Sequence, residues 1–358
     1  MKLLFIFRGD GVGGAEKSMH RLVSDTMFSD IVQTEIWTQD STEIFLQQFC
    51  GKENKTTMID NPKNFYTLFN LMRLLFFYQN KYDKIYVFGF WYTIISRLVP
   101  NLRKEKLIIA IRWNPNFKSL KGSLLLLTEM VLSFRVGSYI CNSKVSCDNL
   151  NRILRIFGRP KAQCIYNGIT VGFTNKQKLT RSTYVKNFVL VANFSRNKGV
   201  FDAIDLVEKV LAKEPNITLT IYGKGYKNFI KNKKVSHLIA TGSLHFGGYV
   251  SNVVDCLYKY DAMISMSKSE GVPTSMLEAI SVNLPVIAYD VDGVSEIIHS
   301  GRNGVLLKNG DLDGFIDSVI NLDKMLPKHM KVKEYNATQL VKFSRYNFVS
   351  HHLDVFND

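Results

Sequence analysis

Long hydrophobic runs are absent from this sequence of 358 residues. No stretch approaches the roughly 18 apolar residues that a membrane-spanning helix requires. The N-terminal segment 1–8, Met-Lys-Leu-Leu-Phe-Ile-Phe-Arg, is too short for a signal peptide and instead predicts a first strand. We therefore expect a cytoplasmic protein that has no membrane anchor of its own.

Paired cysteines and metal-ligand spacings are also missing. The sequence has five cysteines, none of them in a Cys-x-x-Cys arrangement: Cys50, Cys141, Cys147, Cys164 and Cys256. This odd and dispersed set predicts buried thiols in a reducing compartment rather than a disulfide framework or a zinc site. The seven histidines show no ligand spacing either. We therefore expect neither a metal nor another cofactor.

Acidic residues are in the minority, with 31 Asp and Glu against 46 Lys and Arg, a net charge of +15. Residues 1–170 hold 23 basic and 13 acidic residues, a net of +10, whereas residues 171–358 hold 23 and 18, a net of +5. A basic face suits a polyanionic or membrane partner. We expect no nucleic acid, because the sequence contains no recognised nucleic-acid module. Solubility alone is the alternative explanation of the charge.

Short apolar runs alternate with longer helical stretches, and 46% of the residues are hydrophobic. Strands are predicted at 3–7, 34–37, 84–88, 107–111, 138–141, 163–166, 188–193, 218–222, 245–247, 262–266, 286–289 and 305–307. Helices are predicted at 16–25, 65–79, 120–134, 144–156, 200–212 and 275–282. This alternation predicts parallel sheets built from βαβ units. The polar segment 168–186 is the expected linker between two Rossmann-like domains, 1–170 and 171–340, and 341–358 is expected to form a final helix.

Two glutamates eight positions apart, Glu270 and Glu278, follow the predicted strand 262–266. Pro273 fits the first position of the next helix, so Glu270 lies in the loop and Glu278 in the second turn. Both then lie at the carboxyl end of a parallel sheet, where open α/β folds bind ligands. Carboxylates accept hydrogen bonds from vicinal hydroxyls, and the amides at a helix start hold phosphate. The pattern predicts a sugar-nucleotide site.

An ordered set of motifs resembles the retaining glycosyltransferases of family 4, which have the GT-B fold. The motifs are Gly13-Gly14-Ala15-Glu16, Arg112-Trp-Asn-Pro115, Ile165-Tyr-Asn-Gly168, Val191 to Gly199, Gly223-x-Gly225, the two glutamates with Ala279, Pro285-Val-Ile-Ala, Gly293, Glu296-Ile-Ile and Gly301-x-Asn-Gly304. The resemblance spans nearly the whole chain. It implies two Rossmann-like domains whose parallel sheets face an interdomain cleft, with the C-terminal helix crossing back to the first domain.

The resemblance also implies how the donor is bound. Glu270 would contact the hydroxyls of the donor sugar, helped by the amides of Gly271 and Val272, and Glu278 would contact the ribose. Thr274 and Ser275 would supply helix-start amides to the diphosphate. The other implied donor contacts are Gly13, Gly14, Gly223 and Tyr249. For Glu278 the alternative is an ordinary exposed helix glutamate, and for Gly13 and Gly14 it is a tight turn.

Two basic residues of the second half are implied in catalysis. Lys198 would neutralise the leaving diphosphate without a metal, and the alternative is a solvated loop lysine. Many family members carry an arginine five positions before this lysine, where this chain has Asn193. Arg196 is the expected replacement, or else it is an ordinary surface residue.

In the first half, Arg112 would face the cleft and reach the acceptor or the donor sugar, with Asn114 beside it at the acceptor. A buried salt bridge is the alternative role of Arg112.

The predicted helix 65–79 is apolar around most of its circumference, and Arg73 is its only charge. Basic residues follow it in the sequence: Arg97, Arg103, Lys104, Lys106, Lys118 and Lys121. Apolar residues beside basic ones suit the surface of an anionic membrane. We therefore expect peripheral attachment to the inner face of the cell membrane, although a core helix is the alternative for 65–79.

The resulting prediction is a retaining, metal-independent glycosyltransferase. It would move a hexose or an N-acetylhexosamine from a nucleotide-diphosphate sugar to a glycan acceptor, which we expect to be lipid-linked, in surface-polysaccharide assembly. Two alternatives stay open. A sugar-nucleotide epimerase of the same fold would need acid and base carboxylates in the cleft and would convert the donor without an acceptor. A catalytically inert glycan-binding subunit would hydrolyse no donor.

Overall fold

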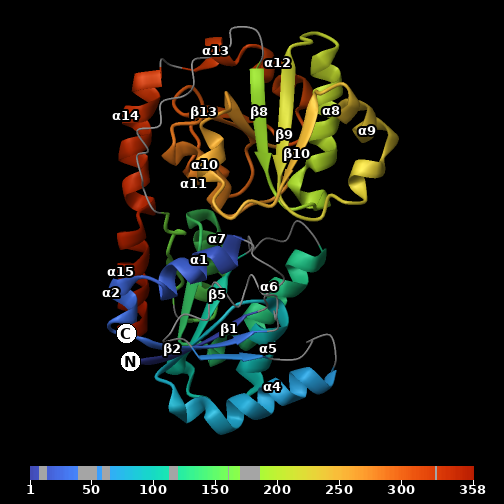
Figure 1. Cartoon of the computed structure of the whole chain (residues 1–358). Coiled ribbons are helices and arrows are strands. Elements are labelled where there is room, and N and C mark those ends of the chain that lie inside the picture. Colours follow the sequence, from blue (N-terminus) through green and yellow to red (C-terminus); the bar gives the residue numbers. More distant parts are fainter. Residues whose placement is uncertain are drawn as a thin grey trace. The chain divides into compact units, whose positions relative to one another are not determined.

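The computed structural model (Figure 1) describes residues 1–7, 14–38, 55–58, 65–112, 120–159, 161–169, 186–326 and 329–358. The chain divides into two compact units. Unit 1 consists of Met1–Gly168 together with Arg345–Asp358, and unit 2 consists of Ile169–Ser344. The C-terminal residues therefore belong to unit 1, although they follow unit 2 in the sequence.

Unit 1 is built on a seven-stranded parallel sheet with the strand order β3-β2-β1-β4-β5-β6-β7. Its strands are β1 (Lys2–Phe7), β2 (Gln33–Thr38), β3 (Lys55–Met58), β4 (Lys84–Val87), β5 (Leu107–Ile111), β6 (Ser138–Cys141) and β7 (Gln163–Cys164). Every neighbouring pair is parallel, as the sequence predicts. Strand β3 was not predicted, because its residues Lys-Thr-Thr-Met form no apolar run.

Helices cover both faces of this sheet (Figure 1). They are α1 (Gly14–Val23), α2 (Thr26–Ser29), α4 (Phe65–Tyr78), α5 (Phe90–Leu98), α6 (Leu120–Leu132), α7 (Lys144–Ile156) and α15 (Arg345–Asn357), with short 3₁₀ turns η1 (Gln79–Lys81), η2 (Lys104–Lys106) and η3 (Ser133–Arg135). Side chains alternate between the two faces of a strand. Accordingly Leu3, Phe5 and Phe7 join one apolar cluster, and Leu4 and Ile6 join the other.

The C-terminal helix α15 is part of the first of these clusters. Phe356 makes an edge contact with Phe5 at 6.3 Å between ring centroids. Phe348 approaches Gly168 so closely that a Cβ there would lie 2.6 Å from it. Full burial of an aromatic side chain stabilises by about 1.5–3 kcal/mol, so these contacts hold α15 on unit 1. Its His352 is completely buried, and burial lowers the pKa of the imidazole to about 3.

One basic residue of the predicted membrane cluster is buried inside unit 1. Arg97 is 1% exposed, and its Nη2 donates to both carboxylate oxygens of Glu129 at 2.7 and 2.8 Å. The hydroxyl of Tyr139 donates to the same carboxylate at 3.0 Å. A buried charge needs such a partner, since desolvation otherwise disfavours it. Assigning Arg97 to a basic surface was therefore wrong.

Unit 2 is built on a six-stranded parallel sheet with the order β10-β9-β8-β11-β12-β13. Its strands are β8 (Lys186–Val191), β9 (Ile217–Tyr222), β10 (Leu244–Gly248), β11 (Ala262–Ser265), β12 (Val286–Tyr289) and β13 (Gly304–Leu307). All six strands were predicted, with bounds that differ by at most two residues at either end. Each of them contains at least two apolar residues, whereas β3 contains one, which explains why the sequence revealed them.

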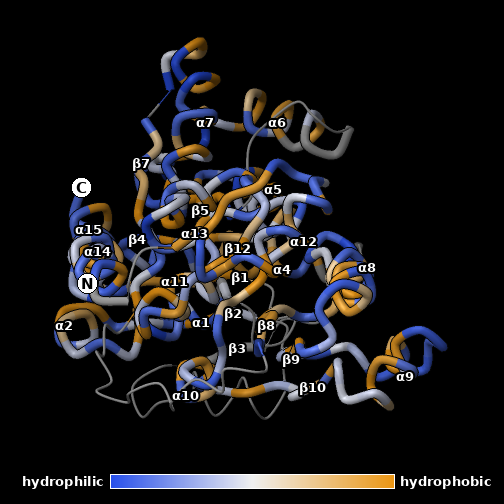
Figure 2. The backbone as a smooth tube through the Cα atoms, turned by 90° about the horizontal axis from the view of Figure 1, so that it is seen from above, coloured by the Kyte–Doolittle hydropathy of each residue, from blue (hydrophilic) through white to orange (hydrophobic). Residues whose placement is uncertain are grey.

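The helices of unit 2 are α8 (Val200–Leu211), α9 (Lys233–Ala240), α10 (Val254–Leu257), α11 (Thr274–Ser281), α12 (Leu312–Ile320), α13 (Leu322–Met325) and α14 (His329–Leu340), with 3₁₀ turns η4 (Arg196–Lys198), η5 (Phe229–Lys231), η6 (Val294–Glu296) and η7 (Val341–Phe343). Hydrophobic and hydrophilic residues alternate along α8 (Figure 2). One face of α8 is buried, as expected for a helix that lies on a sheet. Among the described residues, no helix is long and apolar enough to cross a membrane.

Candidate functional site

The first part of the site is the loop that leaves β11 and enters α11, at the carboxyl edge of the sheet of unit 2. Pro273 has extended backbone angles and caps the helix, and Thr274 is the first helical residue. The predicted position of Pro273 inside the helix is thus shifted by one residue. Glu270 lies in the loop and Glu278 in the second turn, as the spacing predicts. Parallel α/β sheets bind ligands at this edge.

Lys198 and Glu270 form an ion pair across two loops of this edge. The distance from Lys198 Nζ to Glu270 Oε1 is 2.6 Å. The carboxylate side chain is 12% exposed and the lysine side chain 36% exposed. Two charged groups 72 positions apart in the sequence therefore meet at one point that a polar ligand can reach.

Gly199 makes this meeting possible. Its φ is +66°, and a Cβ at this position would lie 1.9 Å from the carbonyl oxygen of Met266. Only glycine fits such a left-handed turn against another backbone. The turn that carries Lys198 therefore packs directly on the end of β11, from which the Glu270 loop departs.

Hydrogen bonds fix the Glu270 loop on both sides. The amide of Lys268 donates to the carbonyl of Asn197 at 2.8 Å, and the amide of Gly293 donates to the carbonyl of Glu270 at 3.3 Å. The hydroxyl of Ser269 donates to Asp292 at 2.7 Å. The loop is thus tied to the turn before α8 and to the segment after β12. The position of Glu270 therefore depends on the segments that follow three strands, β8, β11 and β12.

The start of α11 offers backbone amides to an anion. No side chain caps it, and the first amides of a helix carry partial positive charge. Thr274 is buried, and Glu278 is 8% exposed. The alternative of an ordinary exposed glutamate at Glu278 is therefore wrong. A buried carboxylate in the second turn lies within one helix turn of the loop that carries Glu270.

A second glycine loop packs beside the Lys198 turn. Gly223 has φ +150°, and a Cβ there would lie 1.9 Å from the carbonyl oxygen of Ala192. The side-chain oxygen of Asn193 accepts from the amide of Lys224 at 3.0 Å. Asn193 therefore fastens the glycine loop, a task that an arginine side chain, which has no hydrogen-bond acceptor, cannot perform. This explains the asparagine at the position where the resemblance implies an arginine.

The remaining residues predicted for the donor lie on the same edge or next to it. Arg196 is exposed two residues before Lys198, and it forms no ion pair with other described residues. Tyr249 follows β10, and the Lys224 ammonium lies 4.3 Å from the centre of its ring. Gly271, Val272 and Ser275 belong to the Glu270 loop and the start of α11. The structure thus gathers these residues at one edge.

Arg112 is the functional side chain that the sequence predicts in unit 1. It follows β5, and its two terminal nitrogens donate to the side-chain oxygen of Asn167 at 2.8 Å and to the hydroxyl of Tyr86 at 3.2 Å. Among the described residues it has no acidic partner. Within the described part of the chain, Arg112 therefore bonds to an amide and a phenol rather than to a carboxylate.

The two side chains that accept hydrogen bonds from Arg112 are neutral. Burial raises the pKa of Tyr86, although the charge of Arg112 opposes this. The tyrosine consequently stays protonated and accepts from Arg112. The hydroxyl of Ser18 donates to Asn167 at 3.0 Å. Asn167 belongs to the motif Ile165-Tyr-Asn-Gly168, but its role was not predicted. Tyr86 was not predicted either, because nothing in the sequence links that strand residue to Arg112.

Two predicted residues, Gly13 and Asn114, lie outside the described residues. Gly14 is the first residue of α1 and is exposed. The sequence also contains the spacing Asp290-Val-Asp292, and Asp292 accepts the hydroxyl of Ser269. Within the part of the chain that the structure describes, no group of three or more His, Cys, Asp or Glu side chains is placed to hold a metal ion.

Comparison with known families gives one match within the chain. Residues 173–339 match the family model described as glycosyl transferases group 1. This segment contains Lys198, Glu270 and Glu278. The matched segment thus carries the charged residues that unit 2 brings together at the edge of its sheet.

The alignments with these curated relatives cover about half of this chain. The poly(glycerol-phosphate) alpha-glucosyltransferase of Bacillus subtilis (strain 168) is 28% identical over 163 residues, which cover 45% of this chain and 24% of that protein. The poly(ribitol-phosphate) alpha-N-acetylglucosaminyltransferase of Staphylococcus aureus (strain COL) is 26% identical over 199 residues, covering 52% of this chain and 40% of that protein. The chain therefore spans less than half the length of these relatives.

Among solved structures, HepE of Anabaena in complex with UDP and glucose resembles the whole chain. The TM-score is 0.78 at 18% sequence identity, and the match covers 100% of this chain and 99% of that chain. A likeness at this identity concerns the fold. The predicted α/β architecture of the GT-B type is confirmed.

Proposed function

We propose that this protein is a glycosyltransferase that acts in cell-surface polysaccharide synthesis. It transfers a hexose or an N-acetylhexosamine from a nucleotide-diphosphate sugar to a glycan acceptor. The observation that carries the proposal is the 2.6 Å contact of Lys198 with Glu270 beside the uncapped start of α11. One edge thus offers an acceptor for sugar hydroxyls, a cation and helix amides, which are the groups that a sugar diphosphate requires.

The comparisons support this class of donor and acceptor. The matched family model is one of glycosyl transferases, and the two relatives are named for transfer to poly(glycerol-phosphate) and poly(ribitol-phosphate). HepE was solved with UDP and glucose. We infer that Glu270 binds the donor sugar, that Glu278 binds the ribose, and that Thr274 and Ser275 bind the diphosphate through their amides.

The mechanism that fits these groups is metal-independent and retaining, as in family 4. The bond between the sugar and the diphosphate breaks, negative charge grows on the diphosphate, and Lys198 with the helix amides stabilises that charge. Arg196 supplies the second cation. The acceptor hydroxyl attacks from the face that the diphosphate leaves, and Arg112 of unit 1 positions the acceptor. Fixing both substrates removes much of the entropic barrier.

The two alternatives differ from this proposal in what they do with a donor. An epimerase converts the nucleotide sugar without an acceptor, and an inert glycan-binding subunit leaves the donor intact. The pairing of Lys198 with Glu270 favours transfer over an inert subunit. The two groups match the diphosphate and the sugar of a donor, and an inert glycan-binding subunit binds no donor.

A thermal-shift screen against UDP-, GDP- and ADP-sugars tests the proposal. A ligand at a hundredfold excess over its Kd stabilises the folded state by about 2.7 kcal/mol. We expect one nucleotide series to raise the melting temperature, and the same sugar nucleotides to be consumed only when a glycan acceptor is added. No shift with any nucleotide sugar would exclude the donor site, and conversion of the donor alone would favour the epimerase.

Glu278→Ala should weaken nucleotide binding without unfolding the protein. Losing hydrogen bonds to a charged acceptor costs about 1.5–3 kcal/mol, which corresponds to a Kd raised about 10- to 100-fold. Isothermal titration with the nucleotide identified in the screen measures this. Glu208→Ala is the matched control, since Glu208 is an exposed helix glutamate paired with Lys234. Unchanged nucleotide affinity in Glu278→Ala would remove the ribose assignment.

We also propose that unit 1 attaches to the inner face of the cell membrane, where a lipid-linked acceptor would lie. Helix α5 packs against both α4 and α6. Eleven large apolar side chains are exposed on them and on η3: Phe69, Phe76, Phe77, Tyr78, Phe90, Trp91, Leu98, Leu124, Leu127, Val131 and Phe134. Exposed apolar surface of this extent is typical of a binding face.

Basic residues near this apolar face suit an anionic lipid surface. Arg73, Lys81, Arg103 and Lys104 are exposed on α4 and on the turns that follow. Each basic residue near an anionic membrane contributes about 1 kcal/mol, and the attraction fades within a Debye length of about 8 Å at physiological salt. Attachment should therefore combine a salt-sensitive part with an apolar part.

Vesicle co-sedimentation across a salt series measures both parts. We expect binding to anionic vesicles at low salt and partial release at high salt. Replacing Phe77 and Trp91 by serine should lower the fraction that stays bound at high salt. Tyr346→Ser is the matched control, because Tyr346 is 69% exposed on α15, away from these helices. If the protein ignores anionic vesicles even at low salt, its charge serves solubility alone.

A further inference from the structure

The motif Ile165-Tyr-Asn-Gly168 is part of the family resemblance, yet the proposed function gives it no role. It follows β7, and Gly168 is the last residue of unit 1 before the chain enters unit 2. Asn167 is 4% exposed, and Gly168 is buried as well. Buried polar groups of a folded protein form hydrogen bonds, so the partners of Asn167 indicate what the motif does.

The side-chain oxygen of Asn167 joins two distant parts of unit 1. It accepts from Arg112 Nη1 at 2.8 Å and from the hydroxyl of Ser18 at 3.0 Å. Arg112 follows β5, and Ser18 lies on α1 and is completely buried. An amide oxygen has two lone pairs, and these two bonds occupy both. The oxygen therefore places the guanidinium of Arg112 relative to α1.

Gly168 fastens the same segment to two helices. Its carbonyl oxygen accepts from Arg21 Nη1 at 3.1 Å, and Arg21 lies on α1, three residues after Ser18. A Cβ at Gly168 would lie 2.6 Å from the Cβ of Phe348 on α15. Only glycine allows the backbone to approach another element this closely. Both α1 and α15 therefore hold the segment that carries Asn167.

The other terminal nitrogen of Arg112 is bonded to a side chain that is equally well held. Its Nη2 donates to the hydroxyl of Tyr86 at 3.2 Å. The ring centroid of Tyr86 lies 5.9 Å from that of Phe356 and 6.0 Å from that of His352, both on α15. The donors of a guanidinium have a rigid planar geometry. Two bonds to firmly packed groups therefore fix both the position and the orientation of Arg112.

We propose that Asn167 is a positioning residue of the transfer reaction, which holds Arg112 in place for the glycan acceptor through a neutral amide. An amide oxygen accepts from the guanidinium without adding a negative charge, whereas a carboxylate at the same place would cancel much of the positive charge. Holding a binding group in its productive geometry lowers the entropic part of the barrier. The inference rests on the proposed function, in which Arg112 positions the acceptor.

Asn167→Ala removes both hydrogen bonds of the amide oxygen. We expect kcat/KM for the acceptor to fall about 10- to 100-fold, because a small displacement of a positioning group has an effect of this size. The donor Kd, measured by isothermal titration, should stay within about twofold, since distant sites act independently. Octyl glucoside, octyl galactoside and octyl N-acetylglucosaminide are the acceptor probes, because each presents sugar hydroxyls on an apolar chain, as a lipid-linked glycan does.

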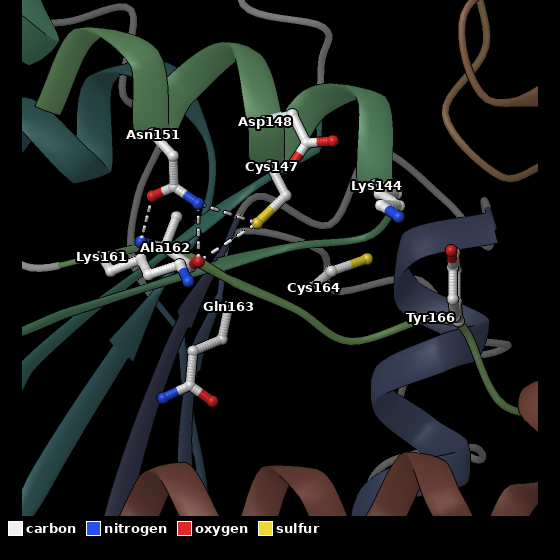
Figure 3. A pocket seen from close by; sticks show the side chains of 9 residues that line it. All are labelled: Lys144, Cys147, Asp148, Asn151, Lys161, Ala162, Gln163, Cys164 and Tyr166. Carbon is white, nitrogen blue, oxygen red and sulfur yellow. Dashed lines mark hydrogen bonds between the residues drawn. The ribbon is translucent and has the colours of Figure 1, made fainter. Parts of the chain in front are cut away.

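A control in the same unit distinguishes positioning from a general loss of stability. The side-chain oxygen of Asn151 accepts from the amide of Ala162 at 2.6 Å, and its amide nitrogen donates to the carbonyl of Ala162 at 3.0 Å (Figure 3). Asn151→Ala thus also removes two hydrogen bonds of an asparagine, close to the motif but away from Arg112. It should lower the melting temperature and leave kcat/KM for the acceptor close to that of the wild type.

A double variant tests whether Asn167 acts through Arg112. When Arg112→Ala is already present, Asn167→Ala should lower kcat/KM by no more than about twofold further, because residues that share one contact are not additive. Fully multiplicative losses would overturn the inference. Wild-type use of the acceptor by Arg112→Ala would instead overturn the proposed role of Arg112. A loss in Arg112→Ala without a loss in Asn167→Ala would overturn the inference alone.

Asn167→Asp separates position from charge. Aspartate keeps both acceptor bonds, so the melting temperature should not fall. Its charge opposes that of Arg112, and kcat/KM for the acceptor should fall about tenfold, because hydrogen bonds from a charged donor are the stronger ones. Full activity of Asn167→Asp would overturn the need for a neutral partner. If Asn167→Ala does not fold, Ser18→Ala replaces it, because it removes only one of the two bonds. An unchanged kcat/KM in Ser18→Ala would then overturn the positioning role.

Discussion

Replacing Lys198 by alanine is expected to lower kcat about 100- to 1000-fold while changing donor affinity little. Removing one group that stabilises developing negative charge commonly has an effect of this size. In the free protein Lys198 is paired with Glu270 at 2.6 Å. Donor binding therefore exchanges that partner for the diphosphate, and the two contributions largely offset each other. The full benefit arises only when the diphosphate leaves with its additional charge.

Single-turnover rates and donor titrations together measure this difference. Lys268→Ala is the matched control, because Lys268 lies on the same loop as Glu270 but is 55% exposed and pairs with Asp202. The control should keep nearly the wild-type rate. Chelators should leave the wild-type rate unchanged, since fixed cations are proposed to replace a metal. A single-turnover rate of Lys198→Ala equal to wild type would exclude Lys198 from leaving-group stabilisation, and complete loss of activity with EDTA would overturn the metal-free mechanism.

Replacing Glu270 by glutamine should lower kcat/KM about 10- to 100-fold. Glutamine keeps the volume of the side chain but loses its charge, and hydrogen bonds to a charged group contribute about 1.5–3 kcal/mol. It also removes the ion pair that places Lys198, so the double variant Lys198→Ala with Glu270→Gln should lose less than the product of the two single losses. Residues that contact each other show such coupling.

Steady-state kinetics of the two single variants and the double variant measure the coupling. Ser269→Ala is the matched control for the loop, because it removes the contact with Asp292 and leaves the Glu270 carboxylate in place. We expect a smaller loss in this control than in Glu270→Gln. Strictly multiplicative losses in the double variant would show that Lys198 and Glu270 act independently, contrary to the contact that the structure contains.

The local order of the site could be predicted from the sequence because it depends on neighbours in the chain. The spacing from Glu270 through Pro273 to Glu278 predicts a loop, a helix start and a second turn, and the structure has them with a shift of one residue at Pro273. The sheet of unit 2 was predicted for the same reason. Strand β3 was not predicted, because Lys-Thr-Thr-Met gives no apolar signal. It is a strand because it pairs with β2.

Contacts between distant residues could not be predicted in the same way. The pairing of Lys198 with Glu270 depends on Gly199 packing against the carbonyl of Met266. The hydrogen bonds of Arg112 depend on Tyr86 and Asn167, which two other segments of the chain contribute. Arg97 illustrates the converse error, because its charge suggested a surface position whereas Glu129 of α6 allows it to be buried.

By itself, the sequence determined the α/β class, the parallel strands of both units and the identity of the charged residues at the edge of unit 2. Those features follow from periodicity and from residues close in the chain, whose geometry the backbone fixes locally. Only the tertiary structure decided which charges meet and which of them are buried. Such contacts close loops of tens of residues, and their partners are selected by packing of the whole unit rather than by any local pattern.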